Sequence, residues 1–208
     1  MSGGAAPRRA RARAALLAQL PAGSVGAEIG VWQGDFSAQI LERVRPALLF
    51  LVDPWRFRPD RWMPTFGTGM LVNSRAEVLA AGGPQRHLDR LHDQVVGRFA
   101  ARSDVVIVRA PGAAFFARCR AQSLSLDWVY VDGDHSYEGA LADIAGAWET
   151  VRPGGLITGD DLGFSDLAEG GRKTVKAAVG DFLAIRPKAR SAFFREGGQW
   201  GFVRTDEP

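Results

Sequence analysis

The sequence predicts an α/β protein with three layers, in which a mostly parallel sheet carries helices on both faces. Short apolar segments alternate along the chain with longer segments whose apolar residues recur at helical spacing. This alternation is typical of strand–helix–strand units, whose strands run parallel. The run Leu48–Val52 is entirely apolar, as expected for a strand that is buried on both faces. Two final apolar segments around Glu196-Gly197-Gly198 predict an antiparallel pair at the end.

Each expected strand is a short, mainly apolar run, and each expected helix has apolar residues three or four positions apart. Pro21 and Pro46 follow the first two helices, because proline cannot continue a helix. The expected strands are Val25–Ile29, Leu48–Val52, Asp104–Val108, Leu126–Val131, Leu156–Thr158, Ala192–Arg195 and Trp200–Arg204. The expected helices are residues 8–20, Phe36–Val44, parts of 74–100, Ala113–Ala121, Tyr137–Thr150 and Thr174–Ile185.

The length of 208 residues suits one domain, and three regions differ in character. Residues 1–21 form a basic helical segment, and residues 22–208 form a single domain without an internal boundary. Residues 54–75 interrupt the alternation with prolines, glycines and aromatic residues. We interpret this segment as an insertion at the sheet edge that acts as a lid, with a packed surface loop as the alternative.

The composition excludes several classes of protein. The chain has 26 Lys and Arg against 23 Asp and Glu, a net charge of +3, which permits an anionic partner without requiring one. The single cysteine, Cys119, excludes an internal disulfide and indicates a reducing compartment. No apolar run is long enough to span a bilayer or to serve as a secretory signal. We therefore expect a cytoplasmic protein with no membrane partner, and a homo-oligomer remains open.

The loop after the first strand is the expected ligand site, because ligands bind at the carboxyl ends of parallel strands. A dinucleotide site would need a second glycine where Trp32 stands, so the loop has the pattern E-x-G-x-x-x-G instead. Gly30 and Gly34 permit a tight turn, and Glu28 can attract an ammonium group. Asp53 follows the second strand and can bind both ribose hydroxyls. This pair of acids favours S-adenosylmethionine over NAD, although each could merely stabilise a turn.

Acidic residues cluster after two later strands. Asp132 follows the strand Leu126–Val131, and Asp160 and Asp161 follow Leu156–Thr158. If these strands are neighbours, the three carboxylates repel one another and favour a divalent cation such as Mg²⁺. His135 is then a candidate general base. Alternatively, His135 is a solvated loop residue and Asp134 caps the following helix.

At these residues the chain resembles a class I S-adenosylmethionine-dependent methyltransferase of the methyltransferase-24 family. The resemblance covers roughly residues 22–185 and implies a Rossmann-like, mostly parallel seven-stranded sheet with a C-terminal antiparallel hairpin. Small sugar and catechol O-methyltransferases that use Mg²⁺ are similar. The matching segments are Glu28–Ser37, Leu51–Arg56, Asp127–Glu138 and Arg152–Asp161.

The resemblance also assigns roles to individual residues. It implies an adenine contact at Ala110–Ala113, where Ala113 departs from the polar residue that often follows the glycine. The implied cofactor-binding residues are Glu28, Gly30, Val31, Trp32, Gly34, Asp53, Gly112 and Asp132. The implied metal ligands are Asp132, Asp160 and Asp161, and the implied catalytic residues are His135 and Asp132.

Three functions are compatible with these observations. The leading hypothesis is O-methylation of a small-molecule hydroxyl, on a sugar or a phenolic ring, with S-adenosylmethionine and Mg²⁺. Methylation of nucleic acid is an alternative that rests on Arg8, Arg9, Arg11 and Arg13, but the other arginines are dispersed and no RNA-binding motif is present, so we do not favour it. The third is a non-catalytic partner protein that keeps the fold.

Overall fold

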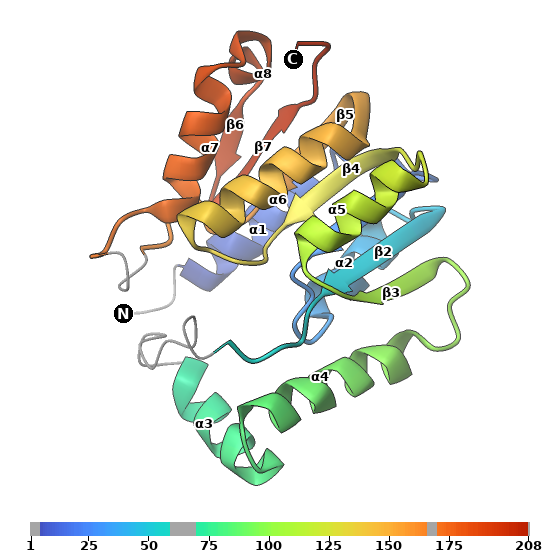
Figure 1. Ribbon diagram of the computed structural model, residues 1–208, viewed down its shortest axis with the longest axis vertical. Helices are drawn as coiled ribbons and strands as arrows, with labels where there is room; N and C mark the ends of the chain where they lie inside the picture. Colours follow the sequence, from blue (N-terminus) through green and yellow to red (C-terminus); the bar gives the residue numbers. More distant parts are fainter. Residues whose placement is uncertain (1–4, 59–69, 166–169, 208) are drawn as a thin grey trace.

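The computed structural model describes residues 5–58, 70–165 and 170–207, and it forms a three-layer α/β structure (Figure 1). One seven-stranded sheet has the order β3-β2-β1-β4-β5-β7-β6. The strands are β1 (Val25–Ile29), β2 (Leu48–Asp53), β3 (Val105–Arg109), β4 (Leu126–Val131), β5 (Val151–Gly159), β6 (Phe194–Glu196) and β7 (Gln199–Val203). The helices are α1 (Ala5–Leu17), α2 (Asp35–Arg43), α3 (Met70–Ala81), α4 (Pro84–Phe99), α5 (Gly112–Ala121), α6 (Tyr137–Thr150), α7 (Thr174–Ala184) and α8 (Pro187–Ser191).

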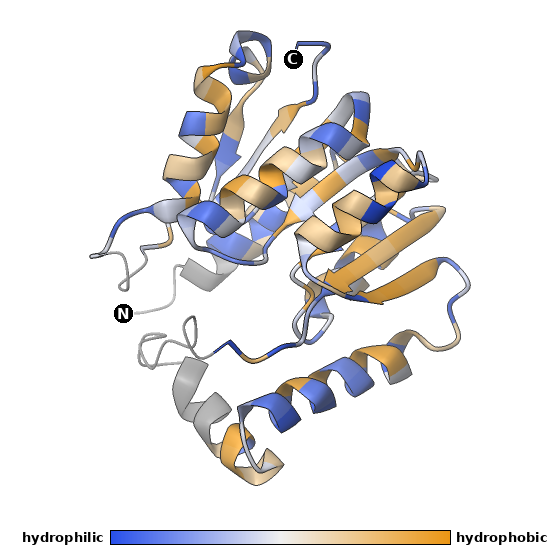
Figure 2. Cartoon of the chain, viewed as in Figure 1, coloured by the Kyte–Doolittle hydropathy of each residue, from blue (hydrophilic) through white to orange (hydrophobic). Residues whose placement is uncertain are grey.

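The pairing of the strands confirms the expected fold class. Strands β1 to β5 are parallel, and β7 is antiparallel to both β5 and β6. The order reverses between β1 and β4, so the loops after these two strands diverge and leave room for a ligand at the carboxyl edge. Figure 2 shows apolar residues concentrated on β2 and β3, as expected for strands of a covered sheet.

Two apolar cores lie on opposite faces of the sheet. Helices α5, α6 and α7 cover one face, where Phe116 and Ile144 are fully buried against Val129. Helices α1, α2 and α4 cover the other face, where Ile40 and Val95 are buried in one cluster with residues of β2 and β4. The basic N-terminal segment is therefore part of the packed structure, because its leucines contribute to the second core.

Some boundaries differ from the expectation. Strand β5 begins at Val151, before the expected start at Leu156, and includes the Pro153-Gly154-Gly155 segment. The short helix α8 was not expected. Of the expected lid at 54–75, residues 59–69 lie outside the described part of the chain, and helix α3 begins at Met70. Among the described residues, no helix combines the length and apolar character required to cross a lipid bilayer.

Candidate cofactor-binding and active site

Four strands end together at the carboxyl edge of the sheet and bring the acidic residues to one place. In the register, Ile29 of β1 pairs with Val52 of β2 and with Val131 of β4, and Val131 pairs with Gly159 of β5. The residues that follow these positions therefore share one edge. The expected acids of this edge are Glu28, Asp53, Asp132, Asp160 and Asp161.

Gly30 makes the turn after β1 possible. Its φ is +93°, a conformation that residues with a Cβ rarely adopt, and its N–H donates a 2.8 Å hydrogen bond to the carbonyl of Val52. A Cβ on Gly30 would overlap the carbonyl oxygen of Asp132. The glycine thus lets the loops after β1 and β4 pack directly against each other. Gly34 also has a positive φ, +77°, at the start of α2.

Asp53 holds the first loop in place with its carboxylate. Its Oδ2 accepts hydrogen bonds of 3.0 Å from the N–H groups of Val31 and Trp32, and its Oδ1 accepts one of 2.7 Å from Trp55. Burial raises the pKa of Asp53, although the three donors oppose this rise. The sequence pointed to Asp53 as a ribose ligand but did not reveal that it also joins the loops after β1 and β2.

Glu28 lies under the same loop and is 1% exposed. The hydroxyl of Ser37 on α2 donates a 2.5 Å hydrogen bond to its Oε2. Burial raises the pKa of Glu28 to about 8, and the Ser37 hydrogen bond only partly opposes this. At neutral pH, in the absence of a cationic ligand, the protonated form of Glu28 is therefore favoured.

Replacing Glu28 with glutamine is expected to remove part of the pH dependence of stability. The folded protein holds a proton on Glu28 up to pH 8 or so, whereas in the unfolded chain the carboxyl has its ordinary pKa of 4.5. The free energy of unfolding should therefore fall as the pH rises between these values, by up to about 1.4 kcal/mol per pH unit. Urea denaturation at several pH values measures this slope.

The exposed Glu42 on α2 provides the matched control. Glu42→Gln should keep the wild-type slope, and Glu28→Gln should flatten it. A wild-type slope in Glu28→Gln would show that Glu28 is ionised in the folded protein.

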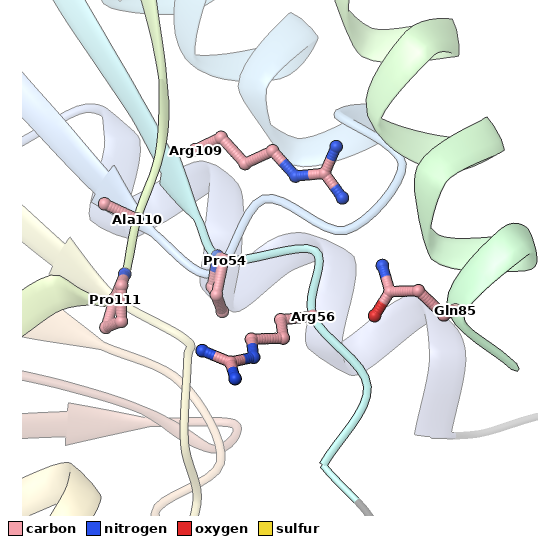
Figure 3. A pocket seen from close by; sticks show the side chains of 6 residues that line it. All are labelled: Pro54, Arg56, Gln85, Arg109, Ala110 and Pro111. Atoms are coloured by element: carbon pink, nitrogen blue, oxygen red, sulfur yellow. The ribbon is translucent and has the colours of Figure 1, made fainter.

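A hollow of about 420 Å³ opens beside Asp53 (Figure 3). It lies between the loop after β2, the start of α4 and the end of β3. The side chain of Gln85 donates to the carbonyl of Trp55 at 3.0 Å, and Arg109 donates to the same carbonyl at 3.1 Å. Both side chains thus fix the wall of the hollow. Its lining residues are Pro54, Arg56, Gln85, Arg109, Ala110 and Pro111.

Two arginines of α1 lie in the acidic cluster at the ends of β4 and β5. Arg9 and Arg13 donate to Oδ2 of Asp160 at 2.6 and 2.7 Å, and the Asp160 side chain is only 1% exposed. Arg13 also lies 3.3 Å from Asp132, and Arg9 lies 3.4 Å from Asp161. Burial opposes ionisation of Asp160, but the two guanidinium groups outweigh it and lower its pKa. These ion pairs could not be inferred from the sequence, because the partners are 119 to 152 residues apart.

His135 joins the other side of the cluster. Its Nε2 lies 3.2 Å from Oδ2 of Asp161 and 3.4 Å from Oδ1 of Asp132, and its ring packs against Phe164. Burial opposes protonation of His135, but the two carboxylates outweigh it and raise its pKa. His135 is therefore a partly buried member of the cluster and not a solvated loop residue. The residue that caps α6 is Ser136, and Asp134 accepts a hydrogen bond from the N–H of Ser136.

The described residues place three possible metal ligands together, and the set differs from the expected one. Ligand atoms of Asp132, His135 and Asp161 all lie within 4.8 Å of one another. Both oxygens of Asp160 already accept hydrogen bonds, from the arginines and from the N–H of Asp161. Two carboxylates and an imidazole suit a divalent transition metal, whereas Mg²⁺ prefers oxygen ligands.

The sheet order and this edge, with a glycine turn after β1 and acids after β2, β4 and β5, define a class I S-adenosylmethionine-dependent methyltransferase. A family model described as a methyltransferase domain, methyltransferase-24, matches residues 27–162. The chain therefore belongs to the methyltransferase-24 family.

Solved structures agree on the fold. The N-methyltransferase NodS from Bradyrhizobium japonicum WM9 matches with a TM-score of 0.55 and 14% identity, covering 95% of this chain and 97% of NodS. The MycE methyltransferase of mycinamycin biosynthesis, in complex with Mg and S-adenosylhomocysteine, matches with a TM-score of 0.52 and 15% identity. The match covers 89% of this chain but only 46% of MycE. Among curated proteins, no sequence matches this chain significantly.

Proposed function

We propose that the protein transfers a methyl group from S-adenosylmethionine to a hydroxyl of a small molecule, a sugar or a phenol. The observation that carries this proposal is the contact of His135 with Asp132 and Asp161 at the carboxyl edge. This contact supports a proton acceptor near Asp132, one of the acids proposed to bind the cofactor. The MycE methyltransferase was solved in complex with Mg and S-adenosylhomocysteine, which supports including a cation in this proposal.

The chain's own residues account for binding and proton transfer in this proposal. Asp53 binds the ribose hydroxyls, and Glu28 attracts the ammonium group of the methionine part. Bound S-adenosylmethionine supplies a methyl group on a positively charged sulfur. His135 accepts the proton of the acceptor hydroxyl through Nε2 while the new O–C bond forms and the S–C bond breaks. Asp132 and Asp161 stabilise the resulting imidazolium, and collinear positioning supplies much of the rate.

A divalent cation would assist by lowering the pKa of the acceptor hydroxyl. Asp132 and Asp161 would hold it, and Asp160 would join them only if Arg9 and Arg13 move away. If His135 itself binds the cation through Nε2, it cannot serve as the base. The Mn²⁺ affinity of the His135→Gln variant separates these roles. If His135 is the base, the variant should bind Mn²⁺ as tightly as wild type; if His135 is a ligand, it should bind Mn²⁺ more weakly.

The described contacts weaken the nucleic-acid alternative. Arg9 and Arg13, half of the basic residues on which it rested, are both paired with the buried carboxylate of Asp160. The buried Cys119 agrees with a reducing compartment, so a cytoplasmic location remains part of the proposal. Binding of S-adenosylhomocysteine with no transfer to any acceptor would favour a non-catalytic partner protein.

His135→Gln is expected to lower the rate of methyl transfer by about 100-fold, because a general base contributes at least this much. Binding of S-adenosylhomocysteine should be unchanged. A radiolabelled methyl-transfer assay with sugar and catechol acceptors measures the rate, and calorimetry measures the binding. His92→Gln, on α4 and outside the cluster of Asp132, His135 and Asp161, is the control and should keep the wild-type transfer rate. Equal rates in His135→Gln and wild type would exclude His135 as the base.

A further inference from the structure

Thr174, the first residue of α7, is a buried polar residue that has no role in the mechanism described above. It is 0% exposed, and its hydroxyl donates a 2.5 Å hydrogen bond to the backbone carbonyl of His135. A buried hydroxyl is costly unless it forms such a bond. The two residues are 39 positions apart in the sequence, so the contact forms only when α7 packs beside the loop after β4.

His135 lies between the end of β4 and the start of α6, in a segment that is neither helix nor strand. Asp132 fixes one end of this segment, because its N–H donates a 2.7 Å hydrogen bond to the carbonyl of Ile29. Ser136 fixes the other end, because its side chain caps the first turn of α6. Thr174 holds the backbone between these two ends, at the candidate base itself.

Two residues that follow β5 hold the imidazole of His135 at the same time. Oδ2 of Asp161 lies 3.2 Å from its Nε2. The ring of Phe164 lies 5.0 Å from the imidazole, measured between ring centroids. Together with the hydrogen bond from Thr174 to the backbone, these contacts determine where the Nε2 atom of His135 lies.

The start of α7 is a fixed support for this contact. The hydroxyl of Tyr137, the first residue of α6, donates a 2.9 Å hydrogen bond to Asp181 of α7. Val179 of α7 is buried in the core on this face of the sheet. Because α7 is held by these contacts, Thr174 can set the position of His135 and does not merely follow it.

We propose that Thr174 is a positioning residue, which holds His135 where its Nε2 accepts the proton of the acceptor hydroxyl. This inference rests on the proposed function, in which His135 is the base. Proton transfer requires close approach of base and hydroxyl, and a displacement of about 1 Å can cost about 100-fold in rate. Loss of the Thr174 hydroxyl should therefore slow methyl transfer without removing any group that touches the substrate.

A purely structural role for Thr174 is the competing explanation. In that case its replacement lowers the melting temperature, as loss of any buried hydrogen bond does, but leaves the imidazole of His135 in place. The chain has three histidines, so His135→Gln assigns the imidazole C–H signal of His135 in a nuclear magnetic resonance spectrum. The ring current of Phe164 makes this signal sensitive to the position of the imidazole, and no acceptor is needed.

The test compares Thr174→Val, which keeps the shape and removes the hydroxyl, with Thr174→Ser, which keeps the donor. At one fixed pH, Thr174→Val should move the His135 signal by more than its line width. With the acceptors of the transfer assay, it should lower kcat at least about tenfold and leave KM within about twofold of wild type. Thr174→Ser should restore both the signal and kcat.

Thr150→Val is the matched control, because it makes the same change at the other end of α6. The hydroxyl of Thr150 is buried and donates to the carbonyl of Gly146 at 2.9 Å. This variant should lower the melting temperature without moving the His135 signal. An equal displacement of the signal in Thr150→Val would overturn the inference, because destabilisation alone would then account for it.

An unmoved His135 signal in a folded Thr174→Val variant also overturns the inference, even if the melting temperature falls. If Thr174→Val does not fold, Thr174→Ala is compared with Thr174→Ser, and the same results are expected. Equal transfer rates in His135→Gln and wild type would instead overturn the proposed function. The signal of His135 is measured without transfer, so the two failures are distinguishable.

Discussion

Asp53→Ala is expected to weaken the binding of S-adenosylhomocysteine by at least about 100-fold, or about 2.7 kcal/mol. The change removes the proposed ribose ligand and also leaves the N–H groups of Val31, Trp32 and Trp55 without their acceptor. Each buried donor that loses its partner costs about 1–3 kcal/mol. The loops after β1 and β2 would therefore lose their shape together with the contact to the ribose. Calorimetric titration measures the affinity.

Loss of binding through general unfolding must be distinguished from loss of the site. Asp53→Asn keeps one carbonyl oxygen for the loop donors but loses the charge, so it should fold better than the alanine variant and still bind weakly. Asp93→Asn on α4 changes an exposed carboxylate and should bind as wild type. Wild-type affinity in a folded Asp53→Asn variant would show that this charge is not needed for binding.

Arg13→Gln is expected to increase the affinity for Mn²⁺ at least about tenfold, about 1.4 kcal/mol. In the wild type, Arg13 contacts both Asp132 and Asp160, and Arg9 contacts Asp160 and Asp161. These guanidinium groups compete with a cation for the same carboxylates and repel it. Removing one of them leaves negative charge that a divalent ion can neutralise. Paramagnetic resonance of Mn²⁺ measures the free ion and hence the affinity.

The same variant should be less stable without metal. Asp160 keeps Arg9 but loses one of its two partners at a buried site, and breaking such a pair costs up to about 3–5 kcal/mol. Added Mn²⁺ should raise the melting temperature of Arg13→Gln more than that of wild type. Arg11→Gln changes an exposed arginine of the same helix that has no contact with the cluster among the ion pairs given above, and it serves as control. Equal Mn²⁺ affinity in all three proteins would exclude competition between arginine and cation.

The expected elements agree well with the structure where the chemistry is local. The strands at Val25–Ile29 and Leu126–Val131 and the helix at Tyr137–Thr150 have the expected bounds. Their ends are set by neighbours in the sequence, such as the Gly30 turn and the Ser136 cap of α6. Strand β5 was extended by pairing with β4 and β7, which no local pattern encodes.

The site residues also fall into two groups, those that local sequence indicates and those that depend on tertiary packing. Gly30, Asp53 and Asp132 could be proposed as site residues because each follows an expected strand whose apolar pattern is evident in the sequence. His135, expected from the sequence as a candidate base, lies 3.4 Å from Oδ1 of Asp132, and its catalytic role stays a prediction. The contacts of Arg9 and Arg13 with Asp160 could not be foreseen. They depend on where α1 packs, and the sequence shows only that this segment is helical.

The sequence by itself determined the α/β class, the alternation of elements and the acids at the strand ends. These follow from periodicity and from the rule that parallel strands present their carboxyl ends at one edge. Only the tertiary structure decided that Arg9 and Arg13 neutralise Asp160. Electrostatic partners are set by distance in space and by exclusion of water, and residues far apart in the chain reach both only after the helices have packed on the sheet.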